Sequence, residues 1–236
     1  MRSPVREDKA YVLHVRRYRE NSLLVEALTS SSGRLGLVAR TSSKSRRPPG
    51  EAVQPFREVT LLFHGREDLQ TLQSAEPLGP VPLLGGERLI SGLYVNELMM
   101  RLTGRGEGDA ALYRLYAETI VGLTGDAPLE PLLRRFEVGL LDLSGYGVDF
   151  TTTADTGQPV VPEERYFFLP EAGFMVQPPP GAAQGLDGRT LLALAGRRDF
   201  DETALREAKR FMRLLLQRQL GERPLQSRAL FGVSGG

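Results

Sequence analysis

The sequence predicts a mixed α+β protein in which a small N-terminal barrel is followed by a helical region that carries an irregular insertion. Three observations support this fold class. Short alternations of apolar and polar residues, separated by turn signals, fill about the first eighty positions. Helical periodicity replaces them after a group of prolines at 77–82. Between about 147 and 186 neither period persists, and the segment is rich in Thr, Pro and Gly.

The barrel is predicted from five short apolar runs. The first run alternates at Tyr11, Leu13 and Val15, and the turn signal at 30–33 makes a hairpin of the second and third runs. One long connection, rich in positive charge, joins the third run to the fourth. Five short strands with such a connection indicate a small closed barrel. The runs cover residues 11–16, 23–28, 35–39, 59–63 and 69–75.

Prolines mark the predicted domain boundary. Pro77, Pro80 and Pro82 end the strand region, because proline neither donates to a sheet ladder nor tolerates a helix directly before it. We therefore expect a barrel domain at 1–81 and a helical domain at 82–236, with the loop-rich insertion at about 147–186.

Three helices are expected directly after this boundary. The first, at 87–103, is apolar on nearly all sides, which implies burial. The second follows Asp109 as its N-cap, and the third runs from about Pro131 to Gly145, a residue typical of a helix C-terminus. We expect these helices to pack as a bundle, which a final helix at about 202–220 rejoins.

Composition and motifs exclude several classes of function. The chain has no cysteine, so it has no disulfide, thiolate nucleophile or cysteine-bound zinc, and it has only two histidines. No phosphate-binding loop, dinucleotide fingerprint, metalloprotease or esterase motif occurs. The glycines of GRGEG at 104–108 lie between helices and are interpreted as a flexible connector. We expect neither enzymatic activity nor a cofactor, although a hydrolase whose site forms only in space stays an open alternative.

The charge balance bears on polyanion binding, and the lengths of the apolar runs bear on cellular location. There are 30 basic and 29 acidic residues, a net charge of +1, so any preference for polyanions must come from local patches. No apolar run approaches the roughly 20 residues needed to span a bilayer, and the N-terminus does not resemble a secretory signal. We expect a cytoplasmic protein with no membrane partner.

The long connection after the third strand is the first candidate site. Arg40, Lys44, Arg46 and Arg47 lie within eight positions, among serine and threonine residues and with no carboxylate between Arg34 and Glu51. Cations and hydroxyl groups are the side chains that contact phosphate without reading bases. The connection therefore predicts nucleic-acid binding, with an ordinary solvated loop as the alternative.

Two further basic groups lie on predicted helices. In the last helix, one face is cationic and the opposite face is apolar, which also fits an ordinary amphipathic helix. Arg134 and Arg135 diverge by about 100° on the third helix, so at most one can enter a given pocket, where it could anchor an acidic peptide end. Surface charge is the alternative for both. The cationic face of the last helix consists of Arg206, Lys209, Arg210 and Arg213.

Five blocks of the chain, taken in order, resemble the bacterial RecO family of recombination mediators and strand-annealing proteins. The similarity covers nearly the whole chain, from about Ala10 to Phe231, and the ordered series carries it rather than any single motif. The blocks are AYVLHVRRYRENSLLVEALTSSSGRLGLVARTSSKSRRP, AVQPFREVTLLFHGREDLQTLQSAEPL, SGLYVNELMMRL, LRRFEVGLLDLSGYGVDF and LREAKRFMRLLLQRQLGERPLQSRALF.

The resemblance implies a five-stranded OB-fold barrel, a helical domain and an insertion that in many members holds a four-cysteine zinc site. Here Thr153 and Thr156 stand where a first Cys-x-x-Cys pair would lie, and no cysteine follows. No metal is therefore expected. The insertion must instead be held by the packing of Tyr166, Phe167, Phe168 and Phe174.

The resemblance also implies a role in DNA repair and homologous recombination. RecO proteins bind single- and double-stranded DNA, anneal complementary strands, contact the acidic C-terminal tail of single-strand binding protein, and work with RecR to load RecA. RecF is a further implied partner, and the location is the nucleoid region of the cytoplasm. The implied DNA-binding residues are Arg34, Arg40, Lys44, Arg46 and Arg47 on the barrel and Arg206, Lys209, Arg210 and Arg213 on the last helix; the implied tail-binding residues are Arg134 and Arg135.

A rival hypothesis comes from another class of function. A barrel joined to a helical bundle could act as a protein–protein adaptor that recognises acidic peptide tails and never touches DNA. It predicts binding to the partner tail alone, whereas the first hypothesis predicts salt-dependent binding to DNA.

Overall fold

The computed structural model describes residues 4–41, 49–65, 69–178 and 185–231. The chain divides into two compact units. The first unit comprises Met1–Asp126 and Leu225–Gly236, and the second comprises Ala127–Pro224. The domain boundary that the sequence suggests at residue 81 stays a prediction.

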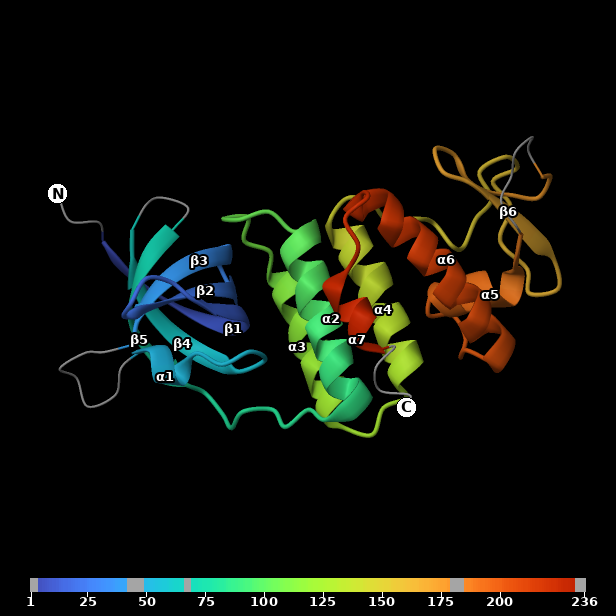
Figure 1. The fold of residues 1–236 in the computed structure, drawn as a ribbon. Coiled ribbons are helices and arrows are strands. Elements are labelled where there is room, and N and C mark those ends of the chain that lie inside the picture. The colour runs from blue at the N-terminus through green and yellow to red at the C-terminus, as the bar shows by residue number, and fades with distance from the viewer. Residues whose placement is uncertain (1–3, 42–48, 66–68, 179–184, 232–236) are drawn as a thin grey trace. The chain divides into compact units, whose positions relative to one another are not determined.

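Five strands of the first unit close into a barrel (Figure 1). Around the barrel the order is β1-β2-β3-β5-β4. Strands β3 and β5 pair in parallel, and the other four neighbouring pairs are antiparallel. The short helix α1 (Pro49–Ala52) lies in the chain between β3 and β4, as in an OB fold. The predicted five-stranded barrel is confirmed. The strands are β1 (Val5–Arg17), β2 (Ser22–Thr29), β3 (Gly33–Arg40), β4 (Glu58–His64) and β5 (Leu69–Pro77).

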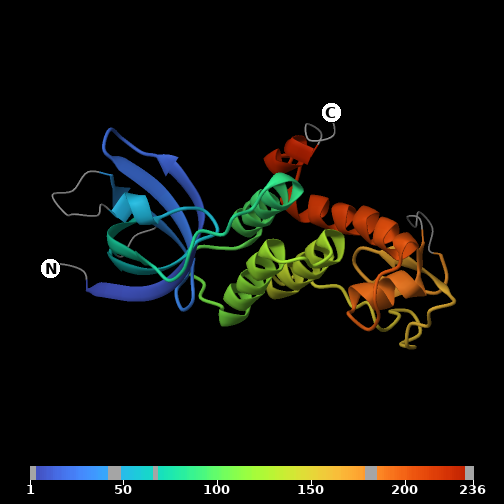
Figure 2. The same ribbon diagram turned by 90° about the horizontal axis from the view of Figure 1, so that it is seen from below.

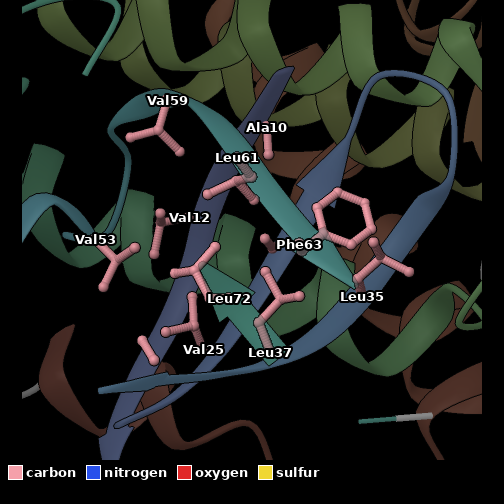
Figure 3. Packing of buried hydrophobic residues seen from close by; sticks show 12 residues of the cluster. Ala10, Val12, Val25, Leu35, Leu37, Val53, Val59, Leu61, Phe63 and Leu72 are labelled. Carbon is pink, nitrogen blue, oxygen red and sulfur yellow. The ribbon is translucent and has the colours of Figure 1, made fainter. Parts of the chain in front are cut away.

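Alternate residues of each strand fill the barrel interior (Figure 3). Because side chains alternate between the two faces of a strand, one apolar set from every strand points inward. Val25, Leu37, Leu61 and Phe63 are fully buried there. Leu23 packs against the edge of this core and lies near Gly50 of α1, so the helix covers that end of the barrel.

A pair of helices lies against one side of the barrel (Figures 1 and 2). These are α2 (Gly86–Leu102) and α3 (Ala110–Thr124), and the predicted N-cap Asp109 accepts a hydrogen bond from the Ala111 amide at 2.7 Å. Gly92 of α2 faces the ring of Phe56, whose φ is +69°. A Cβ atom on Gly92 would lie 2.9 Å from that ring, so only glycine allows this approach.

A buried polar network joins the barrel to these helices. The β1–β2 ladder has a bulge between Val12 and His14, which leaves Leu13 without a partner in the register. The side-chain amide of Asn96 donates to the Leu13 carbonyl at 2.7 Å, and the Tyr116 hydroxyl donates to the Asn96 oxygen at 2.6 Å. Nearby, Tyr113 donates to Glu58 at 2.8 Å; burial and this bond raise the pKa of Tyr113, so the phenol stays protonated.

The segment at 104–108 is a docked loop, and the expectation of a flexible connector is wrong. Gly106 donates its amide to the Arg34 carbonyl at 3.0 Å. A Cβ atom on Gly33 would lie 2.2 Å from the Glu107 carbonyl oxygen, and one on Gly108 would lie 2.1 Å from that of Ser31. The glycines therefore permit direct contact between this loop and the β2–β3 turn.

The C-terminal helix α7 (Gln226–Phe231) docks on α2 through Glu97. The Glu97 carboxylate accepts bonds from the amides of Gln226 and Ser227, both at 2.9 Å, and from the Ser227 hydroxyl at 2.6 Å. Burial alone would raise the pKa of Glu97, but these hydrogen bonds outweigh it and lower the pKa below the ordinary value. An ionised carboxylate thus caps the first turn of α7.

The second unit contains three helices and a small sheet among its described residues. Helix α4 packs against α6 and α5, whereas α2 and α3 lie in the first unit (Figure 2). None of the described helices of either unit is both long enough and apolar enough to cross a membrane. The elements are α4 (Leu129–Leu143), β6 (Arg165–Leu169), β7 (Gly173–Met175), β8 (Leu186–Asp187), α5 (Gly188–Leu194) and α6 (Glu202–Leu220).

Aromatic packing holds the insertion to α6. Phe168 and Phe174, with ring centroids 5.1 Å apart, pack against Phe211 of α6 at 5.0 and 5.4 Å. Phe150 joins this cluster at 5.9 Å from Phe174. Of the expected aromatic residues, Tyr166, Phe168 and Phe174 are buried, while Phe167 is half-buried.

Candidate nucleic-acid interface

The β1–β2 hairpin brings three arginines beside Arg40. Arg16 and Arg17 end β1, where they pair with Leu24 and Leu23 of β2, and Arg19 lies in the turn that follows. On the other side of β2, Ser22 pairs with Arg40 at the end of β3. We call Arg16, Arg17, Arg19 and Arg40 the hairpin cluster.

Strand alternation assigns faces to this cluster. Val15 and Val25 point into the barrel, so their neighbours Arg16 and Leu24 point outward. Tyr18 donates its amide to the Ser22 carbonyl at 2.9 Å, which continues the ladder by one more step. Tyr18, Ser22 and Arg40 therefore form one row across three strands on the outer face, and Arg17 lies at the barrel rim.

The turn itself has an uncommon backbone conformation. Arg19 has φ of +55°, in the left-handed region that residues other than glycine rarely adopt. The amide of Thr41 donates to the Asn21 carbonyl at 3.1 Å and ties the turn to the end of β3. In this conformation the Arg19 guanidinium lies over the ring of Tyr18, 5.1 Å from its centroid.

All four arginines of the hairpin cluster are exposed. Within the described ranges, none of them forms an ion pair with a carboxylate. Glu20 lies in the turn itself, and Glu26 of β2 is already paired with Arg34 and Arg105, so positive charge is in excess here. Such a surface attracts polyanions at low and moderate salt.

Sequence reasoning identified Arg40 but missed the three arginines of the hairpin. The signal was present as RRYRE at 16–20, yet only the strand register shows that it lies next to Arg40. The other predicted residues of the basic connection, Lys44, Arg46 and Arg47, lie outside the described residues.

Arg34 has a different environment from Arg40. Its side chain is 13% exposed, pairs with Glu26 at 2.8 Å, and donates to the Thr103 carbonyl at 2.9 Å. Arg105 of the docked loop pairs with the same carboxylate. Six residues of strand, about 20 Å, separate Arg34 from Arg40. These contacts give Arg34 a structural role in fastening the loop to the barrel.

In the second unit, α6 presents the predicted cationic face. Arg206, Lys209, Arg210 and Arg213 are exposed, while the opposite face is buried with Phe211, Met212 and Leu216 at its centre. Arg206 pairs with Glu202 at 3.0 Å and Lys209 pairs with Glu130 of α4 at 2.5 Å. Both pairs are solvent-exposed, so they are weak and can exchange for phosphate contacts.

The two arginines of α4 differ sharply. Arg134 is 9% exposed at its side chain and pairs at 2.5 Å with Glu137, which is completely buried. Arg135 is exposed. Because residues adjacent in a helix diverge by about 100°, Arg135 is the one that can meet a partner in solution.

Models of two family segments match this chain. The model described as Recombination protein O N terminal matches residues 1–81, and the one described as Recombination protein O C terminal matches residues 84–229. The chain belongs to the RecO family. RecO proteins are mediators rather than enzymes, in agreement with the prediction that this chain is not an enzyme.

Relatives named DNA repair protein RecO are similar over almost their full length. The Alkalilimnicola ehrlichii protein is 44% identical over 225 residues, which cover 94% of this chain and 89% of the relative. The Shigella flexneri protein is 41% identical over 229 residues, covering 94% and 92%, respectively. The Hamiltonella defensa protein is 39% identical over 224 residues, covering 94% and 95%.

The insertion of this RecO family member does not fit the zinc ion that many relatives are expected to hold. The chain has no cysteine, and the hydroxyl groups of Thr153 and Thr156 lie 2.7 Å apart, hydrogen-bonded to each other. Thiolates and imidazoles are the ligands that structural zinc requires. Among the residues with described positions, no group of three or more potential ligands is arranged to hold a metal ion.

Proposed function

We propose that this RecO family member is a DNA repair and recombination mediator that binds single- and double-stranded DNA and anneals complementary strands. The observation that carries the proposal is the hairpin cluster, four exposed arginines that pair with no carboxylate of the described residues, at one end of an OB-type barrel. Barrels of this kind bind oligonucleotides on the face of strands 2 and 3 and on the loop between strands 1 and 2. The cluster occupies that loop, the end of β1 that leads into it, and the end of β3.

The proposed mechanism requires no bond to be made or broken. Each DNA strand is a polyanion, so two strands repel one another, and cations that replace condensed counterions favour their approach. One cationic surface lies on each unit: the hairpin cluster on the first, and the cationic face of α6 on the second. A protein with two such surfaces can hold two strands while base pairing between them selects the sequence.

The same proposal includes protein partners. RecO relatives carry the name DNA repair protein, and we propose that this chain acts with RecR, and with RecF, to load RecA on strands coated by single-strand binding protein, in the cytoplasm. The acidic C-terminal tail of that protein would meet Arg135 of α4, since Arg134 is already paired with Glu137.

Salt dependence and annealing test this function. The log of the affinity for a single strand should fall against log salt with a slope of about −0.7 per neutralised phosphate, so the four arginines of the hairpin cluster predict roughly −3. Complementary fluorescent strands should anneal faster with the protein than without it. A flat salt response together with tail binding would favour the adaptor hypothesis.

A further inference from the structure

We propose that Tyr18 and Arg19 form a stacking site for one base of a single-stranded nucleic acid. This inference rests on the proposed function and deepens it. The proposed function needs only contacts to phosphate. A stacking site would add a contact to an unpaired base, so a strand with bases would bind more tightly than a strand without them.

The geometry of the pair carries the inference. Tyr18 is half-buried at the end of β1 and lies in the outer row with Ser22 and Arg40. The guanidinium of Arg19 lies 5.1 Å from the centroid of its ring. Aromatic rings and guanidinium planes both stack on nucleobases, so a base can lie on the outer side of Arg19 or replace it on the ring.

The backbone of the turn favours the same interpretation. A positive φ at Arg19 is unfavourable for a residue with a Cβ atom, and such conformations persist where the surrounding structure imposes them, often at functional sites. Two hydrogen bonds impose it here, from Tyr18 to Ser22 and from Thr41 to Asn21. They hold the turn in the conformation in which Arg19 covers the ring.

Two arginines near the ring are available to contact phosphate, Arg40 across the sheet and Arg16 along β1. Tyr18 and Arg40 are two strands apart in one row, about 10 Å between backbones, and Arg16 lies two residues back along β1. A base on Tyr18 therefore places its neighbouring phosphates within reach of long guanidinium side chains. Bases in a duplex are already stacked and paired, so this site favours single strands.

A unique fluorophore tests the stacking directly. The chain contains no tryptophan, so Tyr18→Trp introduces a single indole at the site, and Tyr146→Trp provides a control indole at an exposed tyrosine of the second unit. We expect an oligo(dT) strand to quench the emission of Tyr18→Trp, and an abasic strand of equal length and charge to leave it nearly unchanged. Equal quenching by both strands, or none by oligo(dT) while it binds, would overturn the proposal.

Affinity measurements separate this inference from the proposed function. Tyr18→Ala should weaken oligo(dT) binding about 5- to 100-fold and leave the abasic strand and the salt slope unaffected, while Tyr18→Phe should retain affinity. Arg40→Ala should weaken the binding of both oligo(dT) and the abasic strand. If Tyr18→Ala binds oligo(dT) as the parent chain does, stacking is refuted although charge-driven binding stands. If the parent chain binds neither strand, the proposed function itself fails.

Discussion

The buried bond between Asn96 and the bulged carbonyl of Leu13 allows a quantitative prediction. Asn96→Leu preserves the size of the side chain but leaves the Leu13 carbonyl and the Tyr116 hydroxyl without partners. Each unsatisfied buried group costs about 1–3 kcal/mol, and the added apolar surface returns about 1–2 kcal/mol. We expect the free energy of unfolding of the first unit to fall by about 3 kcal/mol.

A double-mutant cycle measured by urea denaturation checks the reasoning. Asn96→Leu leaves the Tyr116 hydroxyl without a partner, and Tyr116→Phe removes that hydroxyl. The loss of unfolding free energy in the double variant should therefore be smaller than the sum of the two single losses, by roughly 1–2 kcal/mol. Exact additivity, or a loss below about 0.5 kcal/mol for Asn96→Leu alone, would show that the network does not join barrel and helices as described.

Three further predictions follow from the fold and the candidate site. Because the pKa of Glu97 lies below its ordinary value of 4.5 in the folded chain, its cap on α7 is complete above that value and is lost as the pH falls through the lowered pKa. Hydrogen exchange of the α7 amides should show this loss, and Glu97→Gln should abolish its pH dependence; an unchanged profile would contradict the cap. Gly92→Ala should destabilise the first unit by about 1–3 kcal/mol in thermal unfolding, since its Cβ collides with the Phe56 ring, and a neutral result would mean that the ring moves freely. Arg34→Ala should lower stability because it removes one partner of the part-buried Glu26 carboxylate, whereas Arg40→Ala should keep stability and reduce the salt slope of DNA binding by about 0.7; the reverse pattern would exchange their roles.

The strands and their order of appearance could be predicted from the sequence because each has one face in the barrel. Alternation at Val25, Leu37 and Leu61 fixes which residues point inward, whatever the partner strand is. The four long helices α2, α3, α4 and α6 were predictable because their caps and apolar positions are local signals, whereas the short helices α1, α5 and α7 were not predicted. Family resemblance added the OB arrangement of the barrel.

The composition of the site depends on pairing, which local patterns do not contain. Arg34 and Arg40 look equivalent in the sequence, but one pairs with Glu26 under the loop at 104–108 and the other ends its strand in solvent. Arg16 and Arg19 belong to the site only because β2 pairs with both β1 and β3. Likewise, the glycines at 104–108 suggested a flexible connector, whereas in the structure Gly108 allows the loop backbone to contact the β2–β3 turn closely.

The hydrogen bond between Thr153 and Thr156 changes what can damage the insertion. Chelators remove zinc and oxidants attack thiolates, so a four-cysteine zinc site depends on a supply of metal and on a reducing environment. Two hydroxyl groups and a cluster of phenylalanine rings depend on neither. The Thr153–Thr156 bond and the phenylalanine cluster should therefore persist under metal chelation and peroxide exposure, two treatments that would disrupt a zinc site built from cysteines.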